Sequence, residues 1–364
     1  MVSKVIMFIM AVFMLWAVTD KIILNNKFGY GSLFDEGMLA MGTMATSMVG
    51  LMCLAPVLGE ALLPVFGPIF EAIGADPSML AGSLLGIDMG GYPLAQEMAG
   101  NPQIAIFSGG IYASMMGVCI TFAIPVALGI LSEEDSPYLA KGIMCGVIVI
   151  PIASFIGGIM MGLAVDVILK NLIPALVLAI LLVIGLVVIP NGMMKGFSVF
   201  AKFINFVVHA SLAIAIFSEL TGIVIIEGMA PIGPQLEVVG IIGITLAGAY
   251  PLVHFITKTF NKPLQRFGSL FKVNDKTISG IIASVANSLP MLAQVKDMPP
   301  RGKVMAIAFM VPAAFALGDH LAYASVNMEE QIFPLIAAKL LGGILAVIVA
   351  MIMMKNSDEV QVNS

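Results

Sequence analysis

Residues 84–100 read LLGIDMGGYPLAQEMAG, a run in which several residues are unfavourable for a helix in a membrane. Asp88 is followed by Gly90, Gly91 and Pro93 within a strongly apolar region. Glycine and proline are unfavourable inside a helix, and an aspartate is costly inside a membrane. We interpret the stretch as a break in the backbone, with Asp88 facing the polar opening that the break creates. The alternative is a surface loop in which Asp88 is hydrated.

The composition is that of an integral membrane protein. Of the 364 residues, 60% are hydrophobic and 11% are charged, and the mean hydropathy is +1.05. Soluble domains carry about 25% charged residues, so this chain has too few to cover a water-facing surface. The sequence therefore predicts an all-α polytopic membrane protein that forms a single transmembrane domain over residues 1–364.

Nine apolar stretches are long enough to cross a bilayer, because a helix rises about 1.5 Å per residue and the hydrocarbon core is about 30 Å thick. Two further stretches, 79–98 and 277–295, are apolar but interrupted, and 59–74 is short and contains two prolines. We expect nine to eleven transmembrane helices, with 79–98 and 277–295 as re-entrant hairpins. The nine long stretches are 4–24, 38–58, 104–131, 139–165, 170–190, 201–226, 236–257, 303–325 and 332–354.

Basic residues predict the orientation in the membrane. They cluster after the first, fifth and seventh long stretches and after 277–295, and connections of this kind lie in the cytoplasm. This arrangement places the N-terminus outside and the C-terminus inside a bacterial inner membrane. The acidic run Glu133–Asp135 fits less well, but acidic residues carry little weight in the rule. The basic residues are Lys21, Lys27, Lys195, Lys202, Lys258, Lys262, Arg266, Lys272, Lys276, Lys296, Arg301 and Lys303.

Similar short motifs occur in the two halves of the chain. The run PLAQ that starts at Pro93 resembles PMLAQ, which starts at Pro290 and ends at Gln294. FAIPVA (122–127) likewise resembles FMVPAA (309–314), and GGI occurs at 157–159 and at 342–344. We expect one repeat over 79–161 and a second over 277–346. Because the two hairpins would enter from opposite sides, the repeats would be inverted, as in many secondary transporters.

A second polar cluster, LGDHLAYAS, occupies residues 317–325. It contains Asp319 and His320, and Tyr323 follows His320 about one helical turn later. These residues are candidates for a binding site inside the membrane. They are equally compatible with the interfacial end of a transmembrane helix.

Several other classes of function find no support in the sequence. Neither a phosphate-binding loop nor a dinucleotide fingerprint is present, and the spacing of cysteines and histidines indicates no metal site. ALGD (316–319) approaches the G-x-G-D motif of intramembrane aspartyl proteases, with Asp88 as a second carboxylate. However, Ala316 replaces the first glycine, and Ile87 stands where such a protease has tyrosine. A transporter without a cofactor and without enzymatic activity is the favoured interpretation, and the protease is a remote alternative.

Four longer runs resemble the bacterial ethanolamine-utilisation membrane protein, the ethanolamine permease family. The runs are EGMLAMGTMATSMVGLMCLAPVL (36–58), LLGIDMGGYPLAQEMAGNP (84–102), SMMGVCITFAIPVALGI (114–130) and GDHLAYAS (318–325). The resemblance implies uptake of ethanolamine across the inner membrane for breakdown by ethanolamine ammonia-lyase in a bacterial microcompartment. It implies no residue-level site.

The residues suggest how such a substrate would be held. An alkylamine with a pKa of about 10 is cationic at neutral pH, so its site needs a carboxylate. We expect Asp88 to pair with the ammonium group, with Asp319 as the second candidate, and Gln96 or Asn287 to bind the hydroxyl. The full set of candidate binding residues is Asp88, Tyr92, Gln96, Glu97, Asn287, Gln294, Asp319, His320 and Tyr323.

Two of these residues have more particular expected roles. The ring of Tyr92 would add a cation–π interaction of about 0.5–2 kcal/mol, and Glu97 would lie at the mouth of the site. Another small polar solute, such as a nucleoside or a different amine, remains an alternative substrate. Coupling to H⁺ or Na⁺ and passive transport both remain open, and no interaction with nucleic acid is expected.

Overall fold

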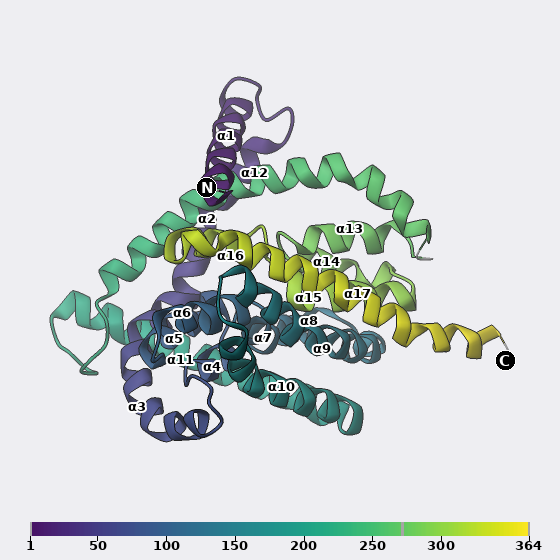
Figure 1. Ribbon diagram of the computed structural model, residues 1–364. Coiled ribbons are helices and arrows are strands. Elements are labelled where there is room, and N and C mark those ends of the chain that lie inside the picture. Colours follow the sequence, from purple (N-terminus) through teal and green to yellow (C-terminus); the bar gives the residue numbers. More distant parts are fainter. Residues whose placement is uncertain (1, 271–272, 363–364) are drawn as a thin grey trace.

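The computed structural model describes residues 2–270 and 273–362, and the regular structure of this part of the chain is helical throughout (Figure 1). The longer helices are α1 (Val2–Ile22), α2 (Tyr30–Met44), α3 (Gly50–Ala72), α9 (Ser136–Met160), α10 (Val165–Val188), α11 (Pro190–Thr221), α12 (Ile232–Leu270), α15 (Pro300–Ala313) and α17 (Ile332–Val362). The shorter helices are α4 (Met79–Leu84), α5 (Tyr92–Met98), α6 (Pro102–Ala105), α7 (Met116–Val118), α8 (Ile124–Ile130), α13 (Asp275–Ser284), α14 (Leu289–Gln294) and α16 (Asp319–Asn327).

Several of these helices are joined or interrupted by segments with a different helical pitch. π-helical segments with wider turns are η1 (Ala45–Val49), η2 (Ile87–Gly91), η3 (Ile106–Tyr112) and η4 (Cys119–Ala123). Tighter 3₁₀ turns are η5 (Glu133–Asp135), η6 (Val295–Asp297) and η7 (Glu329–Gln331).

The prediction of an all-α polytopic membrane protein is confirmed. Within the described ranges, seven helices are long and apolar enough to cross a membrane, and the count is eight if the pair 102–112 and 116–130, bent by 42°, is one span. The remaining expected span, 303–325, is divided into α15 and α16. The expected count of nine to eleven is thus compatible with the structure once the divided helices are counted.

Two regions between the expected spans are helical. Segment 59–74 does not form an element of its own, because α2, η1 and α3 follow one another as a continuous helix from Tyr30 to Ala72. The hydrophilic connection 258–276 is in large part helical, since α12 extends to Leu270. Lys272, which belongs to the predicted basic cluster there, lies outside the described residues.

The helices form two packed groups. In one group α9, α15 and α17 contact one another, and α10 packs on the outer side of α9. In the other group α1, α2 and α12 contact one another, and Figure 1 shows them at the edge of the molecule opposite α10. Helix α11 packs against α3. Large exposed apolar side chains along α10 and α11, such as Ile180 and Phe206, suit a surface that faces lipid.

Segment 79–98 is broken, as the sequence predicts. Helices α4 and α5 are short, and η2 lies between them with two non-helical residues, Met89 and Gly90. Gly90 has a φ of 88°, which side-chain-bearing residues rarely adopt, and a Cβ there would lie 2.7 Å from the Cβ of Leu51. The glycine is therefore required both by the turn and by the approach of α3.

Segment 277–295 is broken as well, between α13 and α14. The break is held by a backbone contact with the segment that follows α15. The N–H of Leu317 donates to the carbonyl of Val285 at 3.0 Å, and a Cβ on Gly318 would lie 2.1 Å from the carbonyl oxygen of Ala286. The first half of the chain has a similar contact, because a Cβ on Gly117 would lie 1.9 Å from the carbonyl oxygen of Leu85. In both halves a glycine after the bend of a span packs against the break of the hairpin.

A buried ion pair links the two halves. Lys303 in the first turn of α15 binds Asp135 in η5, and their side chains are 14% and 4% exposed. The hydroxyl of Ser132 donates to the second oxygen of Asp135 at 3.0 Å.

Replacing Lys303 by methionine is expected to destabilise the protein by about 3–5 kcal/mol, because it leaves a buried carboxylate without its partner. The measurement is thermal unfolding of the purified protein in detergent. Lys296→Met, at an exposed position, is the matched control. Equal unfolding temperatures for the two variants would show that the ion pair between Lys303 and Asp135 contributes nothing to stability.

Candidate functional site

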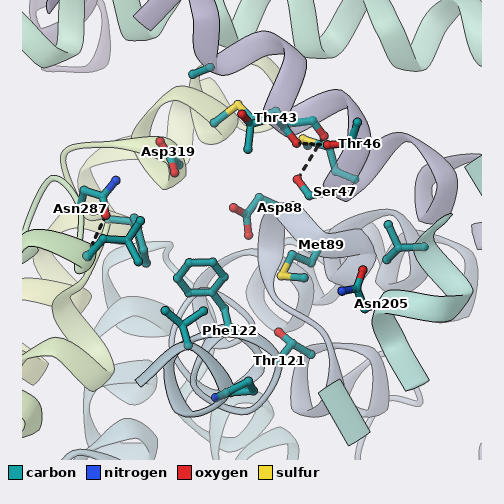
Figure 2. Close-up of a pocket in the computed structure, with 18 of the residues that line it drawn as sticks. Thr43, Thr46, Ser47, Asp88, Met89, Thr121, Phe122, Asn205, Asn287 and Asp319 are labelled. Carbon is teal, nitrogen blue, oxygen red and sulfur yellow. Dashed lines mark hydrogen bonds between the residues drawn. The ribbon is translucent and has the colours of Figure 1, made fainter. Parts of the chain in front are cut away.

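The two broken segments meet at one cavity of about 700 Å³ (Figure 2). Asp88 and Met89 reach it from the first break, and Asn287 and Leu289 reach it from the second. Its other walls come from α2, η1, η4, α8, α11 and α12, from the break after α15 and from the start of α16. Glu36, Thr43 and Asn205 are exposed, so the cavity opens on the side of α2 and α11.

Three of the π-helical segments contribute to the lining. They are η1 with Thr46 and Ser47, η2 with Asp88, and η4 with Thr121 and Phe122. Such segments widen the helix and occur often at functional sites. Their clustering around one cavity therefore supports a functional role for it.

Asp88 projects into the middle of the cavity, between Asn287 and Asp319 on one side and Met89 on the other (Figure 2). Its side chain keeps 25% of its surface accessible because it faces this space. The Nε2 atom of His320 lies 3.8 Å from its Oδ1 atom. The carboxylate is thus free to accept hydrogen bonds from a solute in the cavity.

Asp319 stands at the start of α16, and its carboxylate is on the cavity wall. The hydroxyl of Tyr250 on α12 donates a hydrogen bond of 3.2 Å to its Oδ1 atom. Phe122 and Phe315 also line the cavity, with ring centroids 5.4 Å apart in an edge-to-face arrangement. The site therefore combines carboxylates with aromatic rings.

Replacing Tyr250 by phenylalanine is expected to weaken binding of a cationic solute several-fold, because Asp319 loses the hydrogen bond that holds it in place. The measurement is the dissociation constant of the solute for the variant. The effect of Tyr250→Phe should vanish in an Asp319→Asn background. Equal effects in both backgrounds would show that the tyrosine acts in another way.

The remaining sequence-predicted residues are divided between the surroundings of the cavity and other surfaces. Tyr92, His320 and Tyr323 are buried beside Asp88 rather than on the cavity wall. The hydroxyl of Tyr92 donates to the carbonyl of Asn327 at 3.2 Å, and its ring packs edge-to-face on Tyr323 with centroids 6.0 Å apart.

Gln96, Glu97 and Gln294 lie away from the cavity wall. Gln96 and Glu97 are exposed on α5, and the side chain of Gln294 donates to the carbonyl of Pro290 at 3.0 Å. Asn287, the other candidate for binding a hydroxyl, does face the cavity, although its side-chain oxygen accepts the N–H of Leu289 at 2.9 Å. Of the expected residues, the structure brings Asp88, Asn287 and Asp319 together.

Sequence reasoning missed a larger group of lining residues. The polar members of this group carried a signal, since hydroxyl, amide and acidic side chains in an apolar span are costly. The two phenylalanines among them carried none. The missed residues are Glu36, Thr43, Thr46, Ser47, Thr121, Phe122, Asn205, Tyr250 and Phe315. No set of three or more His, Cys, Asp or Glu in the described ranges could hold a metal ion, and Cys53, Cys119 and Cys145 are buried free thiols.

Comparison with known proteins places the chain in a family. The sequence model described as "Ethanolamine utilisation protein, EutH" matches residues 2–353. A relative from Listeria monocytogenes, named "Probable ethanolamine permease EutH", is 47% identical over 97% of this chain and 94% of its own length. A Salmonella typhimurium protein of the same name is 42% identical over 100% of this chain and 98% of its own.

A Bacillus subtilis relative, "Uncharacterized protein YxeR", is 44% identical over 95% of this chain and 93% of its own. No solved structure matches the chain. Permeases are transporters and not enzymes, so the protein is classed as a non-enzymatic membrane protein that handles a small molecule. The coverage of nearly the whole chain shows that it belongs to the EutH family of ethanolamine utilisation proteins.

Proposed function

We propose that the protein is a permease that admits ethanolamine to the cytoplasm in its ammonium form. Two relatives that match almost the full chain are named probable ethanolamine permeases. The protein would lie in a bacterial inner membrane with its N-terminus outside and its C-terminus inside. Imported ethanolamine would then supply an ammonia-lyase associated with a microcompartment.

The main support for this proposal is the acidic lining of the cavity. Its lining includes the carboxylates of Glu36, Asp88 and Asp319, whereas none of the lining residues is lysine or arginine. His209 is the one lining histidine, and its Nδ1 atom already pairs with the carbonyl of Asn205 at 2.8 Å. A cavity with this charge in a low-dielectric surrounding favours a cationic solute over a neutral or anionic one.

The lining residues supply a partner for each part of ethanolamine. Asp88 pairs with the ammonium group in a charge-assisted hydrogen bond, and Asp319 provides a second carboxylate. The ring of Phe122 lies on the same wall and adds a cation–π contribution of about 0.5–2 kcal/mol. The side chain of Asn287 binds the hydroxyl group.

The order of helices suggests how the site becomes accessible from each side in turn. Each half contains a broken hairpin, a bent or divided span, a 3₁₀ turn and a long helix. The first half is α4 to α9 and the second is α13 to α17. Three long helices, α10, α11 and α12, lie between the halves, so the second half would enter the membrane from the opposite side. Rocking of the two inverted repeats, 79–161 and 277–346, around the cavity would give alternating access.

The proposal is tested by binding and uptake of radiolabelled ethanolamine with the purified protein in detergent and in proteoliposomes. Saturable uptake that exceeds the rate in empty liposomes is the expected result. A nucleoside, choline and ethylamine serve as competitors, because a cavity of about 700 Å³ also has room for larger solutes. Saturable uptake of a labelled nucleoside, with no saturable uptake of ethanolamine, would replace the amine by that alternative substrate.

A further inference from the structure

A lysine is buried in the membrane-spanning core beside the cavity. Lys339 lies on α17, and its side chain is fully buried with a relative exposure of 0%. Lysine is almost never buried completely unless it is paired. The Nζ atom of Lys339 donates a hydrogen bond of 2.6 Å to the carbonyl oxygen of Ser114.

The carbonyl of Ser114 is available because the helix is broken at this point. The N–H of Val118 donates to the carbonyl of Ala113, and the N–H of Cys119 donates to that of Met115. These two backbone hydrogen bonds go to the residues on either side of Ser114, so its carbonyl is left to accept the hydrogen bond from Lys339. In other transporters, carbonyls freed by a broken helix coordinate the coupling cation. Here a tethered ammonium group occupies such a position.

The surroundings of Lys339 connect it to the proposed binding carboxylate. Lys339 is close enough for its charge to act on both Asp88 and His320. The Nε2 atom of His320 is in turn 3.8 Å from the Oδ1 atom of Asp88. The Nδ1 atom of His320 and the hydroxyl of Tyr323 are buried without a hydrogen-bond partner. Both atoms are therefore free to form a hydrogen bond during the transfer of a proton.

The other titratable or charged side chains on the elements that pack against α17 belong to six elements. They are Lys4, Asp20 and Lys21 on α1, Tyr112 on η3, Tyr138, Lys141 and Cys145 on α9, Arg301 and Lys303 on α15, Asp319 and Tyr323 on α16, and Glu329 and Glu330 on η7. Glu329 and Glu330 are exposed, and Lys303 is paired with Asp135.

We propose that Lys339 is a built-in coupling cation: it neutralises Asp88 while the site is empty and releases its proton when an alkylammonium solute binds Asp88. This inference rests on the proposed function of the cavity. The step conserves charge, because one ammonium cation enters the site as one proton leaves the Lys339 ammonium group. His320, which is 3.8 Å from Asp88 and has an unpartnered Nδ1 atom, is the proposed carrier of that proton from Lys339 to Asp88, the group that faces the cavity. Transport would then be proton-linked and independent of sodium.

The experiment counts protons released per bound ethanolamine. Binding to the full-length protein in detergent is measured by calorimetry at neutral pH in phosphate and in Tris, buffers whose ionisation enthalpies differ. The difference between the two binding enthalpies gives the number of protons transferred to the buffer. The same titrations are made in sodium chloride and in potassium chloride, with Lys339→Met and Lys339→Gln, and with Lys141→Met as the control lysine.

The wild-type protein and Lys141→Met are expected to release about one proton per bound ligand, with the same affinity in both salts. Lys339→Met or Lys339→Gln should bind ethanolamine with release close to zero. If a Lys339 variant binds ethanolamine and still releases a proton, the proton comes from another group, which could be the bound amine itself. That result would overturn the inference. Binding by the wild type without proton release, or affinity that requires sodium, would also overturn the inference. Absence of binding by the wild type would instead contradict the proposed function.

Discussion

Replacing Asp88 by asparagine is expected to reduce ethanolamine uptake at low substrate concentration by at least about 30-fold. Removing one partner of a desolvated charge pair costs about 2–5 kcal/mol, and each 1.4 kcal/mol corresponds to about a tenfold change in affinity. Asparagine has nearly the same shape as aspartate, so the change removes the charge and leaves the packing of η2 intact. The measurement is the initial rate of labelled ethanolamine uptake into cells that express the variant.

The matched control is Asp297→Asn, because Asp297 is exposed on η6 and does not line the cavity. This variant should transport as the wild type does. Asp319→Asn should show a smaller loss than Asp88→Asn if Asp88 is the principal partner of the ammonium group. Undiminished uptake by Asp88→Asn at normal membrane abundance would eliminate the role assigned to Asp88.

Replacing Gly318 by alanine is expected to destabilise the folded protein by about 1–3 kcal/mol or more, which is the usual cost of forcing extra atoms into a packed core. The added Cβ would lie 2.1 Å from the carbonyl oxygen of Ala286, so one backbone segment must move. That movement would displace the neighbouring Asn287 and Asp319 on the cavity wall. Thermal unfolding in detergent and the dissociation constant for ethanolamine should therefore change together.

Gly129→Ala is the control for this substitution. Gly129 lies in α8, and a Cβ there meets no atom within 4 Å. Alanine is favoured over glycine in a helix by about 1 kcal/mol, so this variant should be as stable as the wild type or more stable. A Gly318→Ala protein that unfolds at the wild-type temperature would show that the break has room for a Cβ atom, contrary to the 2.1 Å contact.

Local chemistry explains what could be predicted. The low share of charged residues specifies a membrane protein, and the breaks in 79–98 and 277–295 follow from residues such as Gly90 and Pro290, which act on their own backbone. Asp88 is recognisable because a carboxylate in an apolar segment is costly wherever the segment lies. Lys339 carries the same kind of signal within the span 332–354, although sequence reasoning passed over it.

The motif similarities were a weaker guide. FMVPAA ends as α15 ends, before the break that precedes α16, whereas FAIPVA lies beyond the bend at 113–115. The two GGI motifs also differ in place, near the end of α9 and near the middle of α17. Glu133 and Glu329, by contrast, each begin a 3₁₀ turn directly before a long helix. Small apolar residues recur by chance, so their matches align less reliably than the order of the helices.

The residue chemistry is enough to show that this chain lies in a membrane, that it is helical, and where its backbone is interrupted, because each of these depends on the cost of placing particular residues in lipid. Which polar groups meet is visible only in the packed helices. Tyr250 reaches Asp319 and Lys339 reaches Ser114 across helices that are far apart in the chain. Such contacts depend on how the helices pack and rotate, and neither hydropathy nor periodicity encodes that arrangement.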